Sequence, residues 1–202
     1  MAAHSRTAPR RGTVEIPAGD ETLTAVLALP SETRGLILLA SGSRTAAVAD
    51  ELFEAGFASL ILDVRGCCEA WQLIGGLAWL DRDAVVGDLP PSVRRLPVGC
   101  FAAGTAAAAA LIAAAERPDR VCAVVTWQGR TDLAAEVLPQ VGAPTLLIVN
   151  ETDAELLRVN RQARSALGGE VGFVPVRGPE VTGRVAALAR DWFLVHLPSA
   201  RG

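Results

Sequence analysis

The chain of 202 residues contains no lysine and no tyrosine, and only two histidines. Without lysine there can be no Schiff-base amine, phosphate-loop lysine or lysine general base. Without tyrosine there is no phenolic acid or base. His4 lies in a basic N-terminal stretch, and His196 lies near the end of the last predicted helix. The chain therefore offers almost nothing from which to build a histidine-based metal site or a histidine-containing triad.

The four cysteines lack the spacing of a zinc site. They are Cys67, Cys68, Cys100 and Cys122, and no pair has the Cys-x-x-Cys spacing. We therefore expect no metal and no cofactor. Residues 1–11 lack the apolar core of a signal peptide, and no apolar run is long enough to cross a membrane. These features favour a cytoplasmic protein with reduced thiols and no membrane association.

Charge and hydropathy favour a buried α/β sheet over a nucleic-acid-binding surface. The net charge is −3, which gives no electrostatic reason to expect nucleic acid as a partner. Half of the residues are hydrophobic, as suits a parallel sheet covered on both faces. The length predicts a single domain, which we place at residues 12–197 behind a flexible tail of residues 1–11.

Apolar runs alternate with helical patterns along the chain, which predicts a three-layer α/β fold. Its core would be a mostly parallel, doubly wound sheet of about eight strands with right-handed crossovers. The predicted strands are 13–16, 22–29, 35–40, 57–62, 97–102, 121–127, 144–150 and 171–176. The predicted helices are 46–55, 69–86, 105–116, 132–138, 154–167 and 181–197. Thr152 and Glu155 have the spacing of a capping box for the helix at 154.

Residues 96–107 read as a buried strand, a sharp turn and an alanine-rich helix. Gly104 occupies the turn, between the small residues Ala102 and Ala106. A small-x-Ser-x-small turn in this context is the nucleophile elbow of hydrolases, and here glycine stands at its centre. Glycine adopts the strained backbone of such a turn at little cost, but it has no side chain to react.

On these residues the chain resembles the dienelactone hydrolase-like branch of the α/β-hydrolases, over nearly its whole length. The stretches that carry the resemblance are 34–43, 96–107, 116–121, 143–153, 160–161, 191–193 and 196–197. The resemblance implies a catalytic triad whose nucleophile position falls on Gly104 and whose acid position falls on Asp153. The histidine position falls near residues 177–180, where the sequence is Arg-Gly-Pro-Glu. Ser41 and Gly42 stand where the family often has His-Gly.

Other side chains follow the carboxyl ends of the predicted strands, where open α/β sheets bind their ligands. The helix that begins at Thr105 would offer free N–H groups to an anion, and Arg44, Arg65, Arg130 and Arg177 could lie on the same rim. For each arginine taken alone, a solvated loop residue is the favoured interpretation. The full set of predicted ligand-binding residues is Ser41, Gly42, Arg44, Cys67, Cys68, Thr105, Trp127, Gln128 and Arg130.

Asp153, Cys67 and Cys68 each have an alternative, purely structural interpretation. Asp153 lies at a helix start, where the helix dipole favours acids, so it could be a relic of a triad or a structural residue. Cys67 and Cys68 could supply a thiolate nucleophile, or could simply pack below an irregular segment. Trp127 could line a cavity for an apolar ligand.

Three functions remain open from the sequence. The first is a non-hydrolytic pseudoenzyme that binds a small hydrophobic or anionic ligand, a partner protein or a second copy of itself. The second is a repurposed cyclase, isomerase or lyase that works by positioning and electrostatics. The third is a residual hydrolase that uses Cys67 or Cys68. None of the three is a standard Ser/Cys-His-Asp hydrolase.

Overall fold

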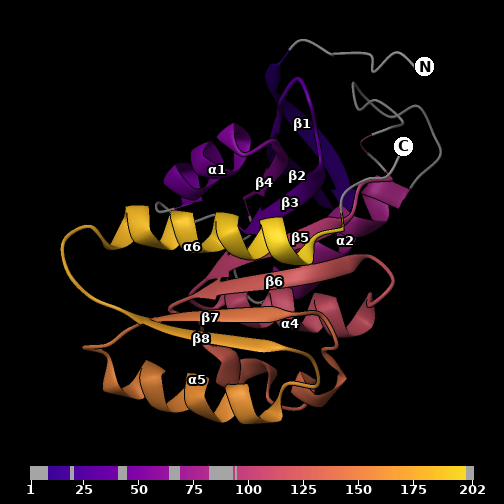
Figure 1. The fold of residues 1–202 in the computed structure, drawn as a ribbon. Coiled ribbons are helices and arrows are strands. Elements are labelled where there is room, and N and C mark those ends of the chain that lie inside the picture. Colours follow the sequence, from indigo (N-terminus) through magenta and orange to yellow (C-terminus); the bar gives the residue numbers. More distant parts are fainter. Residues whose placement is uncertain are drawn as a thin grey trace.

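A computed structural model of the chain describes residues 9–18, 21–40, 45–63, 69–81, 93 and 95–198. An eight-stranded sheet runs through it in the order β1-β2-β4-β3-β5-β6-β7-β8 (Figure 1). β3 to β8 are parallel to one another, β2 is antiparallel to β4, and β1 is antiparallel to β2. The predicted mostly parallel α/β sheet is confirmed.

The elements agree closely with the predicted ones. The strands are β1 (Arg10–Ala18), β2 (Glu21–Leu29), β3 (Gly35–Ala40), β4 (Phe57–Leu62), β5 (Val98–Ala103), β6 (Val121–Trp127), β7 (Thr145–Asn150) and β8 (Val171–Val176). The helices are α1 (Thr45–Glu54), α2 (Glu69–Asp81), α4 (Ala106–Glu116), α5 (Ala154–Ala166) and α6 (Val181–His196).

Two predictions differ from the structure by more than one residue within the described ranges, and residues 82–86 of the helix predicted at 69–86 lie outside them. β1 begins at Arg10, inside the stretch that we expected to be tail, and Arg11 pairs with Asp50 of α1 at 2.9 Å. The single helix predicted at 132–138 is instead two 3₁₀ helices, η2 (Thr131–Ala134) and η3 (Leu138–Gln140). Pro139 explains the break, because proline cannot donate the backbone hydrogen bond that a continuous helix needs.

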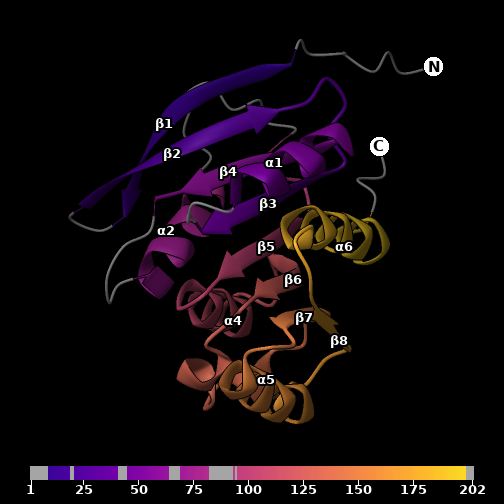
Figure 2. The same ribbon diagram turned by 90° about the vertical axis from the view of Figure 1, so that its left-hand side faces the viewer.

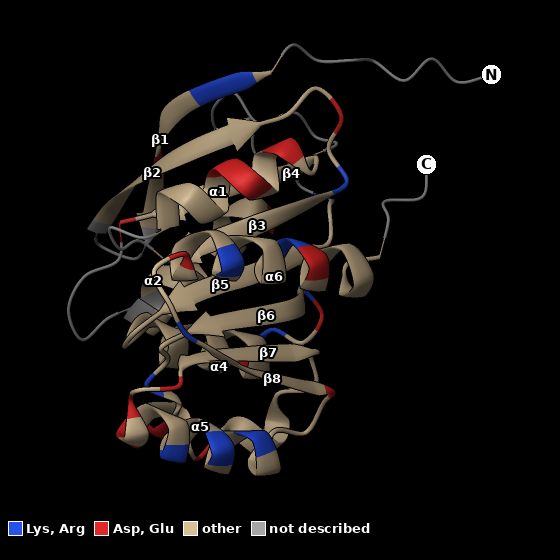
Figure 3. Ribbon diagram, turned by 60° about the vertical axis from the view of Figure 1, so that its left-hand side comes forward, with Lys and Arg blue, Asp and Glu red and all other residues tan. Residues whose placement is uncertain are grey.

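The sheet is covered on both faces, as Figure 2 shows. α1 and α6 pack on one face, and α2, α4 and α5 on the other. β3 to β7 contain no charged residue, and in Figure 3 the charges lie mainly on helices and at strand ends. α4 is almost wholly buried, which its run of alanines permits because the small side chains allow neighbouring elements to approach closely.

β8 forms one edge of the sheet, and its proline fits that position. Thr145 N–H donates to Glu170 O, and Glu151 N–H donates to Val176 O. The even-numbered residues of β8 therefore direct their backbone groups toward β7, and the odd-numbered ones direct them outward. Pro175 thus removes a donor from the outer edge, which weakens that edge as a template for another strand.

No helix in the described ranges has both the length and the apolar character to cross a membrane.

Candidate functional site

The turn after β5 has the backbone of a nucleophile elbow. Gly104 has φ +61°, the left-handed region that favours glycine, and α4 begins two residues later. A Cβ built on Gly104 would meet no atom within 4 Å. The strand, turn and helix are therefore present as predicted, and a side chain at this position would be opposed by backbone strain and not by crowding.

The last residue of β6 and the turn that follows it form backbone hydrogen bonds to Gly104. Gly104 N–H donates to Trp127 O at 3.2 Å, and Arg130 N–H donates to Gly104 O at 2.9 Å. Ala107 N–H also donates to Gly104 O, at 3.3 Å, and Ala108 N–H donates to Thr105 O at 3.0 Å. Two N–H groups that we expected to be available to an anion at the start of α4 are thus occupied by the turn itself.

Asp153, at the predicted acid position, caps α5. Its Oδ1 accepts a hydrogen bond from Leu156 N–H at 3.0 Å. The predicted capping box is wrong, because Thr152 is not the N-cap: its N–H and hydroxyl both donate to Asn150 Oδ1. The helix begins one residue later than the box requires, since the turn after β7 is closed by Asn150. Asp153 therefore has a structural role.

The two arginines of the predicted rim that the structure describes are both paired with carboxylates. The Arg130 guanidinium donates to both oxygens of Asp132, at 2.9 and 2.7 Å. This pair raises the pKa of Arg130 and lowers the pKa of Asp132. Arg177 donates to Glu151 at 3.0 Å and is largely exposed. Their positive charge is largely offset locally, which weakens the case for an anion site on this rim.

Gln128 connects the ends of two strands. It has φ 51°, and no other non-glycine residue in the described ranges has a positive φ. Its Oε1 accepts a hydrogen bond from Asn150 N–H at 2.6 Å, and its own N–H donates to Ile148 O. Trp127 beside it is 3% exposed and packs in the core under α1 and α6. Strain next to an elbow is typical of functional sites, although it does not identify a function.

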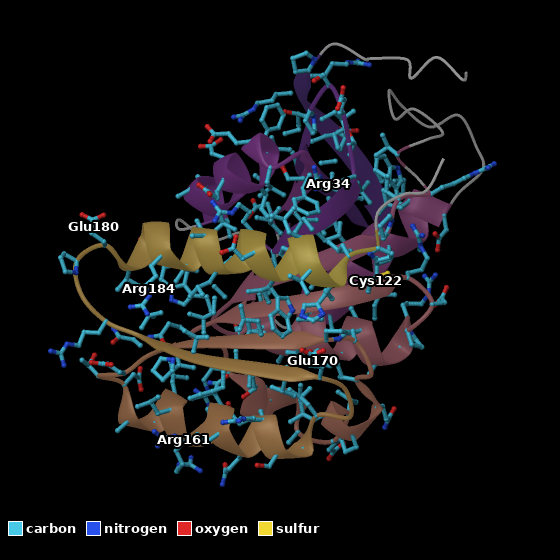
Figure 4. The ribbon with its side chains drawn as sticks, viewed as in Figure 1. Arg34, Cys122, Arg161, Glu170, Glu180 and Arg184 are labelled. Atoms are coloured by element: carbon cyan, nitrogen blue, oxygen red, sulfur yellow. The ribbon has the colours of Figure 1, made fainter. Side chains whose placement is uncertain are left out.

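His196 lies near the start of β8, whereas Gly104 follows the carboxyl end of β5. Its ring packs on Trp192 with centroids 4.0 Å apart, and Nε2 lies 3.8 Å from Glu170 Oε1. Glu170 precedes β8, whereas residues 177–180 follow it, and Figure 4 labels Glu170 and Glu180 at these separate places. A six-residue strand is about 17 Å long. Among the described residues there is therefore no histidine near Gly104.

Five of the predicted ligand-binding residues lie outside the described residues: Ser41, Gly42, Arg44, Cys67 and Cys68. The strands that precede them, β3 and β4, end side by side, with Ala40 opposite Leu62. The structure brings together Gly104, Thr105, Trp127, Gln128 and Arg130 through the contacts above, and it places Asp153 after the neighbouring strand β7.

Sequence reasoning missed Asn150, whose backbone and side chain join the turns after β6 and β7. Its position at the end of a strand was the available signal, but an asparagine there is common in turns of every kind. In the described ranges no three His, Cys, Asp or Glu side chains gather as metal ligands would.

Comparison with known proteins places this geometry in a family. The structure is similar to a dienelactone hydrolase from Anabaena variabilis, with a TM-score of 0.83 and 32% identity over 94% of this chain and 99% of that one. It also shares its fold with the esterase domain of a Rhodothermus marinus protein, at a TM-score of 0.73 and 18% identity over 91% and 98% of the two chains. The chain therefore belongs to the dienelactone hydrolase-like branch of the α/β-hydrolase superfamily.

The curated relatives carry a different kind of name. Two Mycobacterium tuberculosis proteins, from strains H37Rv and CDC 1551, are provisionally named phosphoribosyl transferases and are each 36% identical to this chain over 211 aligned positions. The match covers 91% of this chain and 46% of each relative, so the chain spans about half the length of the curated relatives it matches. No protein-family model matches the chain.

Proposed function

We propose that this chain is a non-hydrolytic member of the α/β-hydrolase superfamily that binds a small ligand or a partner protein. The observation that carries the proposal is Gly104, which stands at the predicted nucleophile position and has φ +61° and no reactive side chain. Its N–H and its carbonyl are both engaged by the segment that follows β6. The elbow thus acts as a fixed backbone turn.

The two other triad positions support the same conclusion. Asp153 uses Oδ1 to cap α5, and the segment after β8 has no histidine. Acyl transfer needs a base to take the proton of the nucleophile and return it to the leaving group, and here no such base lies near the elbow among the described residues. Restoring the nucleophile alone would leave this requirement unmet.

Turnover of activated esters is the direct test. We expect the purified chain to hydrolyse p-nitrophenyl acetate and butyrate no faster than an equal concentration of Gly104→Ala. Steady turnover that disappears in a Cys67→Ala/Cys68→Ala double variant would establish the cysteine hydrolase instead. Steady turnover that survives both changes would also contradict the proposal.

Binding is tested separately from hydrolysis. Native mass spectrometry of the freshly purified chain would show a retained small molecule or a second copy by mass. A chain that carries neither, and whose thermal unfolding is unchanged by a panel of aromatic and aliphatic carboxylates, would remove the ligand-binding half of the proposal. Conversion of one of those compounds to a product that has not incorporated a water molecule would favour the cyclase, isomerase or lyase.

A second candidate function rests on the curated relatives. The match covers 46% of each relative, and the fold of this chain is accounted for by a dienelactone hydrolase of nearly equal length. We propose that any phosphoribosyl transfer by those relatives belongs to their remaining half, and that a chain of the present kind serves it as an accessory module. Release of pyrophosphate from phosphoribosyl pyrophosphate, with purine and pyrimidine bases as acceptors, should be absent for this chain alone. Release by this chain alone would refute the accessory role.

A further inference from the structure

Three fully buried side chains near the elbow each have an oxygen that lacks a hydrogen-bond partner. Thr126 on β6, Thr131 at the start of η2 and Asn160 on α5 are all 0% exposed. Within the described part of the chain, Thr126 Oγ1, Thr131 Oγ1 and Asn160 Oδ1 have no partner. Polar groups this deeply buried are nearly always satisfied in native proteins, by protein or by ordered water.

The turn around Gly129 brings the three residues together. Asn160 Nδ2 donates to Gly129 O at 2.8 Å, which leaves Oδ1 as the free end of the same amide. A Cβ built on Gly129 would lie 3.4 Å from Thr126 Oγ1. Thr131 follows two residues later, and η2 packs against both α4 and α5. All three residues therefore lie beside one short stretch of backbone, residues 126–131.

The same stretch holds the elbow. Trp127 O and Arg130 N–H, which bond to Gly104, flank Gly129 on either side. A Cβ on Gly129 would come within 2.7 Å of Ala107 Cβ, so the turn lies directly against the first turn of α4. A molecule bound beside this stretch would therefore contact the same backbone that forms hydrogen bonds to Gly104.

We infer that one ordered water molecule binds among Thr126, Thr131 and Asn160 and joins β6, η2 and α5. The hydrogen-bond inventory favours water over a cation, because each threonine hydroxyl needs an acceptor and Asn160 Oδ1 needs a donor. One water can accept a hydrogen bond from both threonine hydroxyls while it donates to Asn160 Oδ1. A cation would coordinate the oxygens and leave both hydroxyl protons without an acceptor. The assignment does not depend on the proposed function.

Replacing threonine by valine distinguishes the two cases by whether the melting temperature rises or falls. Valine keeps the shape of threonine and removes the hydroxyl. If the hydroxyl has no partner, its removal relieves a buried polar group, and the melting temperature (Tm) rises or stays constant. If it binds the water, Thr131→Val and Thr126→Val each lower Tm, by roughly 2–6 °C for a chain of this size. A single shared water further requires that the double variant loses less Tm than the sum of the single losses.

Two matched variants calibrate the result. Ser59→Ala removes another buried hydroxyl that has no partner among the described residues. No second such oxygen lies on β4 or on the neighbouring strands β2 and β3, so a bridging water has no pair of side chains to join there and Tm should not fall. Thr145→Val removes a hydroxyl that donates to Ala143 O at 2.9 Å, and should lower Tm. The proposal is overturned if Thr126→Val and Thr131→Val behave like Ser59→Ala, or if their losses are strictly additive.

An experiment on the unmodified chain covers the case in which a variant fails to fold. Water-to-methyl nuclear Overhauser effects to Thr126 and Thr131, with the sign of a long-lived contact, would support the bound water. Absence of both effects, with the methyl resonances assigned, would overturn it.

Discussion

The backbone N–H of Arg130 donates to the carbonyl of Gly104 at 2.9 Å, so the turn after β6 supports the turn after β5. The guanidinium group of Arg130 also pairs with the carboxylate of Asp132. The residue that holds the elbow therefore also fixes the start of η2. This coupling explains how the turn at Gly104 keeps its conformation, because the turn is part of the packing at the carboxyl ends of β5 and β6.

The left-handed backbone of Gly104 predicts a specific cost of substitution. Gly104→Ala should destabilise the chain by about 1–2 kcal/mol, because a Cβ is disfavoured at φ +61° although it meets no atom. Gly142→Ala is the matched control, since a Cβ there also meets nothing within 4 Å and its φ is not positive. Urea unfolding measures both. Equal costs for the two variants would show that strain at Gly104 is unimportant.

Restoring a serine at the elbow should not restore hydrolysis. We expect Gly104→Ser to cleave p-nitrophenyl esters no faster than Gly104→Ala, since no described histidine reaches the turn and His196 lies near the other end of β8. Initial rates at several ester concentrations decide this. A gain of more than about a hundredfold, the lower end of what general-base catalysis supplies, would show that another base is in place.

Asp153 is expected to matter for stability through its hydrogen bond to Leu156. Asp153→Ala removes the N-cap of α5 and should cost about 1 kcal/mol. Asp153→Asn and Asp153→Ser keep a capping oxygen and should recover most of that loss. If Asp153→Asn were as unstable as Asp153→Ala, the charge and not the cap would be what stabilises the helix.

The ion pair of Arg130 and Asp132 predicts an acid-sensitive contribution to stability. Because Arg130 holds the pKa of Asp132 below its ordinary value of about 3.9, the contribution is present above about pH 5. It is lost as the pH falls through the lowered folded-state pKa. Tm should therefore fall less between pH 6 and pH 3 in Asp132→Asn than in the native chain, by a few degrees at most.

The partner residue provides the check on that assignment. Arg130→Met should flatten the acid limb of the Tm profile in the same way, and combining it with Asp132→Asn should add nothing further. An additive effect in the double variant would assign the pH dependence to other carboxylates.

The backbone of Gln128 is tested by comparing two small replacements. Gln128→Ala and Gln128→Gly both lose the hydrogen bond from Asn150 N–H, but only alanine keeps a Cβ at φ 51°. The glycine variant should therefore be more stable than the alanine variant by about 1–2 kcal/mol. Equal stabilities would mean that the turn relaxes once the amide is gone.

The pattern of apolar runs and polar turns in the sequence was sufficient to predict most of the strands and helices. Continuous apolar runs bounded by polar turns placed β3, β4, β6 and β8 at their observed limits, because a strand buried on both faces must be apolar throughout. The details that failed depended on local hydrogen bonds. α5 begins at Ala154 as predicted, but its N-cap is Asp153 because Thr152 bonds to Asn150, and the segment after Arg130 forms two 3₁₀ helices.

What the amino-acid sequence determined by itself was the α/β class, the strand, turn and helix around Gly104 and the absence of lysine and tyrosine, since these follow from periodicity and from which residue types are present. The tertiary structure alone decided what the remaining polar groups do. Asp153 caps a helix, Arg130 pairs with Asp132, and His196 lies near the start of β8, at the opposite end of that strand from residues 177–180. A hydrogen bond or an ion pair is a relation in space, and residues distant or adjacent in sequence satisfy it only once the strands are in register and the helices are packed.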